Sequence, residues 1–248
     1  PRQQAPLYVN GRLYSQGNDR VYALDAYNGT VLWSLDVPGM RRVNIPRDTG
    51  NMCADADALF ITVKNTCWRL GGDSGRLERV YTTGAGLEDK SRDWGYLAVV
   101  GEQLVGSRVV PDSSYTSFNG PDKWYDETSG GYGTSQVISR SLFSLARDDG
   151  RVRWNRESGV ILNSTITIGG GRLYYIETTS SSLVNAGVGR TGSADLWRNN
   201  YMVALDLASG EVIWRRALTL PASPAPLVAF LLYSDERLIT SIANSRYH

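Results

Sequence analysis

The sequence predicts an all-β protein built from repeated four-stranded units, and two observations carry this prediction. The first is a repeat: ALDAYNGTVLW at residues 23–33 returns almost unchanged as ALDLASGEVIW at residues 204–214. Two degenerate copies lie between them, at residues 69–81 and 144–154. The second is the alternation of apolar and polar residues around each copy, which is typical of half-buried strands. Self-similarity at this spacing, with four strands per unit, predicts a β-propeller of antiparallel blades.

Each copy of the repeat is predicted to form a β-hairpin. Asn28 and Gly29 reverse the chain, because glycine adopts a positive φ at no steric cost. Residues 30–33 are β-branched, aliphatic or aromatic, so a second strand follows. Asp25 is placed to accept hydrogen bonds from the amides of the turn. The equivalent residues of the second clean copy are Ala204, Asp206, Gly210 and Trp214.

A second hairpin precedes each copy, which gives four strands per unit. We expect one domain over residues 1–248, either a whole propeller or a fragment of one. Its blades are predicted at about 6–33, 53–81, 96–154 and 165–214, with a partial fifth blade at 227–248. The turn glycines of the four copies are 46, 75 and 60 residues apart, so the later blades must contain insertions.

The pattern A-x-D-x-x-x-G-x-x-x-W resembles the tryptophan-docking motif of the PQQ-type, or quinoprotein-like, β-propeller superfamily. That superfamily includes quinoprotein alcohol dehydrogenases and the non-catalytic propeller of the bacterial outer-membrane-protein assembly machinery. The resemblance implies that the last aromatic residue of each blade packs on the next blade, with Tyr81 in this role in blade two. It also implies a larger ring of about eight blades, of which four and a part are visible. The docking residues implied are Ala23, Asp25, Gly29, Trp33, Gly150, Trp154, Ala204, Asp206, Gly210 and Trp214.

Composition excludes several classes of partner. The chain has 26 basic and 25 acidic residues and a net charge of +1, so no nucleic-acid partner is expected. The longest apolar run, at 227–233, is too short to span a bilayer, so no transmembrane segment is expected. No signal peptide is visible, but the family resemblance implies a periplasmic or otherwise extracytoplasmic location. Further domains of a longer parent chain are also expected.

Conventional catalytic motifs are missing from the sequence. His248 is the single histidine, which leaves no Ser-His-Asp triad and no histidine-based metal site, so no metal is expected. Cys53 and Cys67 are predicted on the first and third strands of blade two, roughly 9–10 Å apart. This separation is too large for a disulfide, so we expect two free thiols, mostly buried. The quinoprotein dehydrogenases usually carry two adjacent cysteines, which this sequence lacks.

Four long segments are expected to gather on one face of the propeller, here called the loop-bearing face. Residues 34–52 and 82–95 connect blades, whereas residues 111–135 and 180–200 separate the second and third strands of a blade. In an up-and-down blade both kinds of segment emerge on the same side, and loops presented by a rigid scaffold often carry function. The Gly-rich string at 187–192 is expected to be flexible. The candidate residues for binding are Arg42, Arg47, Trp94, Trp124, Tyr125 and Trp197, each of which could equally serve as structural cover.

Three functions remain open at this stage. The first is a non-catalytic PQQ-like propeller that acts as an extracytoplasmic binding or assembly scaffold without a cofactor, and whose protein or small-molecule ligand binds the loop-bearing face. The alternative is a quinoprotein dehydrogenase of alcohols or sugars that depends on PQQ and calcium, with catalytic residues that the sequence does not identify. The third is a glycan-binding or glycan-active propeller, suggested by the aromatic residues and acids of the 111–135 insertion. The balance favours a protein that is not an enzyme.

Overall fold

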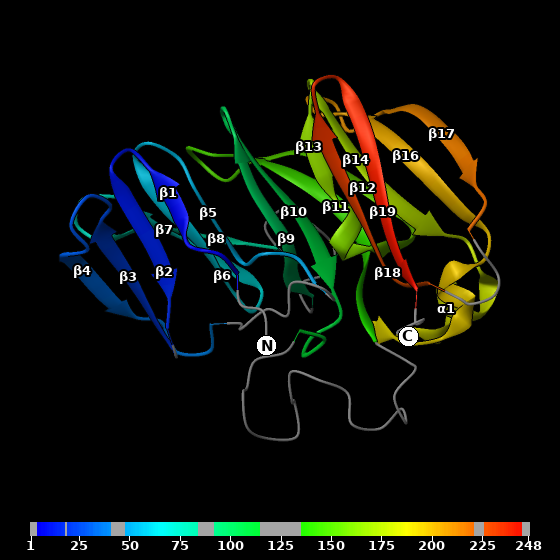
Figure 1. Cartoon of the computed structure of the whole chain (residues 1–248), viewed down its shortest axis with the longest axis horizontal. Helices are drawn as coiled ribbons and strands as arrows, with labels where there is room; N and C mark the ends of the chain where they lie inside the picture. Colours follow the sequence, from blue (N-terminus) through cyan, green and yellow to red (C-terminus); the bar gives the residue numbers. More distant parts are fainter. Residues whose placement is uncertain are drawn as a thin grey trace.

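The fold is a curved row of antiparallel β-sheets. The computed structural model describes residues 4–17, 19–40, 48–83, 92–114, 135–220 and 226–244. Figure 1 shows the four blades side by side in chain order along an arc, with the last hairpin packed against the fourth blade. The all-β prediction is confirmed, and the blade count fits a partial propeller.

The strands of the first two blades form two separate four-stranded sheets. Blade one contains β1 (Leu7–Val9), β2 (Arg12–Gln16), β3 (Arg20–Asp25) and β4 (Val31–Asp36). Blade two contains β5 (Met52–Ala54), β6 (Ala58–Val63), β7 (Thr66–Gly71) and β8 (Leu77–Thr82).

The third and fourth blades contain the insertions, and a hairpin follows them. Blade three contains β9 (Asp93–Val100), β10 (Gln103–Val109), β11 (Gln136–Ala146) and β12 (Val152–Leu162), and blade four contains β13 (Thr167–Gly169), β14 (Arg172–Thr178), β16 (Asn200–Asp206) and β17 (Val212–Leu218). The shorter elements are η2 (Asn163–Thr165), α1 (Ser181–Ala186), β15 (Arg190–Thr191) and η3 (Ala194–Trp197). The final hairpin is β18 (Pro226–Ser234) with β19 (Arg237–Asn244).

The turns between third and fourth strands follow the sequence prediction. Asp25 Oδ1 accepts hydrogen bonds from the backbone N–H groups of Tyr27 at 2.8 Å and Asn28 at 3.1 Å. Asp206 Oδ1 accepts the equivalent bond from the Ser209 N–H at 2.9 Å. Hydrogen bonds from Ser209 hold the pKa of Asp206 below its usual value, because they stabilise the ionised carboxylate.

Blades three and four are joined into one nine-stranded sheet, which the sequence did not predict. β12 continues past the predicted end of the third unit to Leu162, and its Ile161 pairs with Glu177 of β14. Gly159 permits this junction, because a Cβ at that position would lie 2.6 Å from the carbonyl oxygen of Thr178. The chain therefore passes between these blades without the break in pairing seen after blades one and two.

The hydrophobic core lies between the blades. Three of the four apolar clusters lie largely between neighbouring blades, and the fourth lies between blade four and the final hairpin; the first, between blades one and two, includes the fully buried Tyr14 and Leu59. The strand β6 is buried at all six positions, which matches its nearly continuous apolar sequence ALFITV. A strand covered on both faces needs apolar residues on both, so strict alternation is lost there.

An indole at the end of a blade hydrogen-bonds to the turn of the next blade. Trp33 Nε1 donates to the carbonyl oxygen of Gly72 at 2.8 Å, and Trp154 Nε1 donates to that of Leu207 at 2.9 Å. Each indole also lies over a turn glycine of the receiving blade. The large aromatic surface is buried while its one polar hydrogen is paired, as a buried tryptophan requires.

The same contact is altered after blade two and after blade four. Tyr81 replaces tryptophan at the end of blade two, and its hydroxyl donates to the carbonyl oxygen of Arg147. Trp214, at the end of blade four, packs at 6.0 Å between ring centroids against Tyr174 of its own blade. Tyr174 in turn stacks on Tyr233 of the final hairpin at 5.7 Å. Aromatic residues therefore link each blade to the next one, and blade four to the final hairpin.

Both cysteines are free, as the sequence predicted. Cys53 lies on β5 and Cys67 on β7, with β6 between them in the sheet. Cys67 is fully buried, whereas Cys53 is half-buried. Burial raises the pKa of both thiols, so the reactive thiolate form is scarce near neutral pH.

Alanine at the equivalent turn glycines should separate backbone strain from lost docking. A Cβ on Gly29 meets no atom within 4 Å, whereas on Gly75 and Gly210 it would lie 2.5 Å and 2.7 Å from the docked indoles. All three glycines have φ between +64° and +76°, so each substitution carries a similar backbone strain. We expect Gly29→Ala to lower the free energy of unfolding by about 1 kcal/mol, and Gly75→Ala and Gly210→Ala by about 3 kcal/mol because overpacking is added.

Equilibrium denaturation of the three variants measures these differences. Gly150→Ala provides an intermediate case, because its Cβ would lie 3.2 Å from the Tyr81 ring. Equal losses at all four positions would contradict the docking explanation, since backbone strain alone would then account for them.

Candidate functional site

Asp48 ties three segments of the loop-bearing face together. Its side chain is buried, although it comes from the long connection between blades one and two. Oδ2 accepts a hydrogen bond from Ser114 Oγ at 2.8 Å, and Oδ1 accepts one from Asn163 Nδ2 at 3.2 Å. Ser114 belongs to the insertion of blade three, and Asn163 begins the connection to blade four. The carboxylate of Asp48 therefore links the connection between blades one and two to blades three and four.

The hydrogen-bonded network continues from Asn163 into the sheet of blade three. Ser139 Oγ lies within hydrogen-bonding distance of Asn163 Oδ1 and, at 2.8 Å, of Ser107 Oγ. Ser107 Oγ accepts from the backbone N–H of Tyr96 at 2.8 Å. Asn163, Ser139 and Ser107 are completely buried. Because buried polar groups are costly unless paired, this chain of bonds fixes the inner side of the loop-bearing face.

The two insertions also contact each other. Gly189 O, from the insertion of blade four, accepts a hydrogen bond from the N–H of Ile138 at 2.9 Å. The next residues, Arg190 and Thr191, form β15 and pair with β11. Gly189 also lies directly against the side chain of Ser113 in the other insertion. The expectation that residues 187–192 form a flexible string is therefore wrong, because pairing with β11 orders them.

Buried charges near these segments are paired within the blades. Arg108 donates from Nε to Ser141 Oγ at 2.7 Å and from Nη2 to Glu157 Oε1 at 2.5 Å. Glu177, at the junction of blades three and four, accepts from Arg215 Nε at 2.8 Å. These groups stabilise the scaffold, since unpaired buried charges would be strongly unfavourable.

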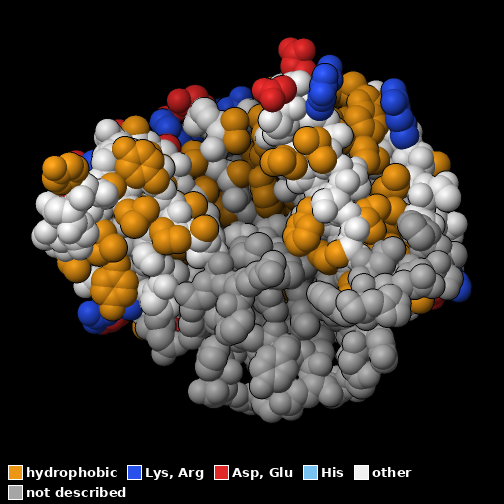
Figure 2. All heavy atoms as spheres, viewed as in Figure 1, with side chains coloured by type: hydrophobic (Ala, Val, Ile, Leu, Met, Phe, Trp, Pro, Cys, Tyr) orange, Lys and Arg blue, Asp and Glu red, His pale blue; other side chains and the backbone are white. Residues whose placement is uncertain are grey.

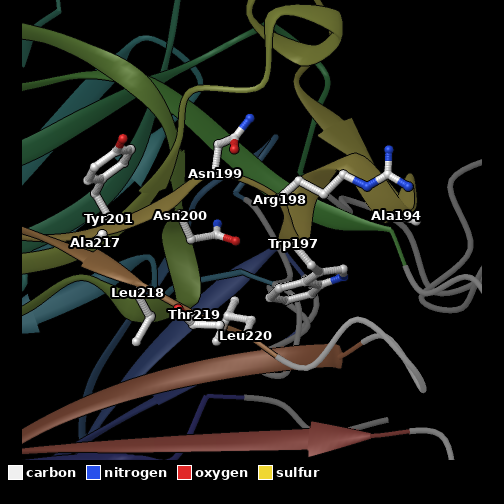
Figure 3. A pocket seen from close by; sticks show the side chains of 10 residues that line it. All are labelled: Ala194, Trp197, Arg198, Asn199, Asn200, Tyr201, Ala217, Leu218, Thr219 and Leu220. Atoms are coloured by element: carbon white, nitrogen blue, oxygen red, sulfur yellow. The ribbon is translucent and has the colours of Figure 1, made fainter.

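A pocket of about 500 Å³ lies beside the insertion of blade four, between η3, the start of β16 and the end of β17 (Figure 3). The residues that line it are Ala194, Trp197, Arg198, Asn199, Asn200, Tyr201, Ala217, Leu218, Thr219 and Leu220. Trp197 and Asn200 stand at its centre, and Asn200 Nδ2 donates to the carbonyl oxygen of Leu196 at 3.0 Å. The pocket therefore combines an aromatic wall, apolar side chains and amide groups.

The structure separates the sequence candidates. Trp197 lines the pocket, but Trp94 is fully buried, donates from Nε1 to the carbonyl oxygen of Tyr96 at 2.9 Å and meets Phe143 edge-on. Trp94 is thus a core residue rather than part of a binding surface, because β10 and β11 cover it. The remaining candidates, Arg42, Arg47, Trp124 and Tyr125, lie outside the described residues.

Sequence reasoning missed Asp48, Asn163 and Asn200. Asp48 and Asn163 stand in short polar stretches that look like ordinary connections. Asn200 follows an asparagine at the end of an insertion, where an exposed side chain would be the usual expectation. No local pattern marks any of the three, because their importance comes from partners elsewhere in the chain.

The described residues do not fit a calcium site. Calcium takes six to eight oxygen ligands, usually with several carboxylates. The Asp48 network has a single carboxylate, and both of its oxygens already accept hydrogen bonds. Within the described ranges, no three His, Cys, Asp or Glu side chains come together in a way that could hold a metal ion.

None of the helices in the described ranges is long and apolar enough to cross a membrane.

Comparison with protein families gives one match over more than half of the chain. The sequence model of a family described as "Outer membrane protein assembly factor BamB" matches residues 2–159. The chain therefore belongs to this family. The matched residues include blades one and two and nearly all of blade three, so the family assignment rests on the same repeats that predicted the propeller. Comparison with curated protein sequences finds no match.

Solved structures show the same fold. A quinohemoprotein alcohol dehydrogenase from Comamonas testosteroni is 12% identical, with a TM-score of 0.56 over 97% of this chain and 39% of that chain. A quinohemoprotein alcohol dehydrogenase from Pseudomonas putida HK5 is 14% identical, with a TM-score of 0.55 over 96% and 38%. BamB from Moraxella catarrhalis is 14% identical over 96% and 62%, with a TM-score of 0.48 that adds no support.

The chain spans about two fifths of the length of the two dehydrogenases. At these identities, a shared fold does not carry an activity with it. The PQQ-type propeller character of the chain is established.

Removal of the Asp48 carboxylate should destabilise the protein. Asp48→Ala leaves the buried donors of Ser114 and Asn163 without their acceptor, so we expect the free energy of unfolding to fall by about 3 kcal/mol. Asp73→Ala is the matched control, because its side chain is 88% exposed and pairs with Arg12 at the surface. The control should change stability by about 0.5 kcal/mol. Equal small losses in denaturant titrations would show that the Asp48 network does not hold the face together.

Proposed function

We propose that this protein is a non-catalytic PQQ-like propeller that acts as an extracytoplasmic binding or assembly scaffold. The observation that carries the proposal is the family match over residues 2–159, whose description names an outer membrane protein assembly factor. The loop-bearing face, held by the buried Asp48 network, supports it as the place where a partner binds. Its partner is a protein, and its location is outside the cytoplasm.

The structure of the loop-bearing face suits such a role. The strands β6 and β10 of the sheets beneath it are almost completely buried, and described parts of the elaborated segments converge at Asp48, Ser113 and Gly189. A partner that contacts this part of the face would meet a preorganised surface, which lowers the entropic cost of binding. Figure 2 shows apolar side chains spread over the visible face of the arc rather than gathered in one patch. In that view, no single large hydrophobic patch suggests another binding site.

The second candidate is a quinoprotein dehydrogenase of alcohols or sugars that uses PQQ and calcium. It is supported by the fold shared with the two quinohemoprotein alcohol dehydrogenases. Among the described residues, no three His, Cys, Asp or Glu side chains are grouped so that they could hold a metal ion. The two candidates differ in one measurable property, the binding of PQQ.

Titration with PQQ in the presence of calcium distinguishes the candidates. For a scaffold we expect no saturable quenching of tryptophan fluorescence and no rise in melting temperature, because a ligand that does not bind the native state cannot stabilise it. A saturable response that is lost when EGTA removes calcium would overturn the proposal and identify a quinoprotein. Cooperative melting of the protein without ligand is the required control.

Site-specific photo-crosslinking tests the binding face directly. A photoreactive amino acid is placed at the exposed Asn185 of α1, on the loop-bearing face, or at Tyr27, in a turn at the opposite ends of the strands. We expect the Asn185 derivative, expressed in the source organism, to crosslink to a component of outer-membrane-protein assembly identified by mass spectrometry. The Tyr27 derivative should not. Identical products from both positions, or none from Asn185, would contradict a partner on this face.

A further inference from the structure

The pocket at Trp197 has the size of a small-ligand site. It lies between η3, β16 and β17, and its volume of about 500 Å³ is within the range typical of small-molecule pockets. The wall formed by η3 is anchored, because Leu196 is buried and Ser193 Oγ accepts a hydrogen bond from the N–H of Asp195 at 3.2 Å. The pocket wall is thus formed by a segment that is anchored to the rest of blade four.

Asn200 presents an unpaired acceptor in this pocket. The residue is only 3% exposed, and its Nδ2 is used by the carbonyl oxygen of Leu196. Its Oδ1 has no hydrogen-bond partner among the described residues. Figure 3 shows the amide directed from β16 toward Trp197. A buried acceptor without a donor is unfavourable, so a ligand that brings an O–H or N–H group to it would be bound selectively.

The charge of the lining favours a neutral ligand. Arg198 is the one charged residue among those that line the pocket, and its side chain is 72% exposed. It is also paired with Asp195 at 3.1 Å, so it supplies no free positive charge. An anionic group would gain little from such a cation, and a cationic group would find no acid in the lining.

Trp197 supplies a flat surface beside this acceptor. Its indole is partly buried and packs on the apolar cluster between blade four and the final hairpin. The face of an aromatic ring is electron-rich and attracts polarised C–H groups. Leu218 and Leu220 extend the apolar lining, and Thr219 adds a hydroxyl. A purely apolar ligand would leave Asn200 Oδ1 unpaired, whereas a ring with both C–H faces and hydroxyl edges matches every part of the lining.

We propose that this pocket binds a neutral carbohydrate unit that stacks on Trp197 and donates a hydroxyl hydrogen to Asn200 Oδ1. A sugar ring has an apolar face of C–H groups and an edge of neutral hydroxyls, which is the combination the lining selects. The proposal goes beyond the scaffold function and does not depend on it. It also differs from the glycan hypothesis based on the 111–135 insertion, because it rests on another segment of the chain.

Saturation-transfer NMR with maltose, cellobiose and N,N′-diacetylchitobiose tests the proposal. We expect at least one of these neutral disaccharides to show saturable transfer to its ring protons. Trp197→Ala should weaken this binding by about tenfold, because the stacking surface is lost. Tyr8→Ala is the matched control, since Tyr8 is an exposed aromatic residue on blade one, and it should leave the binding unchanged.

Two further variants keep the test decisive. Trp197→Phe retains a smaller ring and should bind with intermediate affinity, while Asn200→Ala should weaken binding because the acceptor is gone. Each variant must first show the melting temperature of the parent within experimental error, so that lost binding is not lost folding. No transfer from any of the three sugars, or equal transfer in Trp197→Ala, would overturn the proposal. Binding only of a peptide rich in Asn and Gln would overturn it too, since the pocket would then recognise amides.

Discussion

The aromatic contact between one blade and the turn of the next is the interaction on which this structure depends. A lone four-stranded sheet would expose two apolar faces to water, and these blades are stable because each one covers an apolar face of its neighbour. Trp33 and Trp154 fix the relative position of neighbouring blades in two ways, through buried indole surface and through a hydrogen bond to a turn carbonyl. The turns can receive a ring at such close range because glycine stands beneath it.

The described residues of the loop-bearing face are positioned by this stacking. Asp48 can serve Ser114 and Asn163 at once only because the blades hold their strand ends at a constant separation. The network is buried, so each bond in it matters more than a similar bond at the surface. The same arrangement brings the two insertions into contact at Gly189 and supports the pocket at Trp197. The arrangement of the described residues on this face is therefore a property of the whole arc and not of any one loop.

Sequence patterns predicted what depends on neighbouring residues. The repeat, the turn at Gly29 and the separation of Cys53 from Cys67 by a strand all follow from local hydrophobic periodicity and turn chemistry. The order of residues 187–192 did not, because a Gly-rich string has no conformational preference of its own and is fixed here by β11. The sequence left open whether Trp94 belongs to a binding surface or covers the core, because only the packing of β10 and β11 decides which side of the sheet edge is covered.

The sequence by itself determined the class of this protein: an all-β propeller of the PQQ type with two free thiols. The tertiary structure alone decided which polar residues meet on its loop-bearing face. Asp48 and Asn163 are 115 residues apart, and Asn200 has its unpaired oxygen because of the path of one insertion. Contacts between residues so far apart in the sequence depend on the angle between blades and on where the insertions rejoin the sheet. Neither can be deduced from a local pattern of residues.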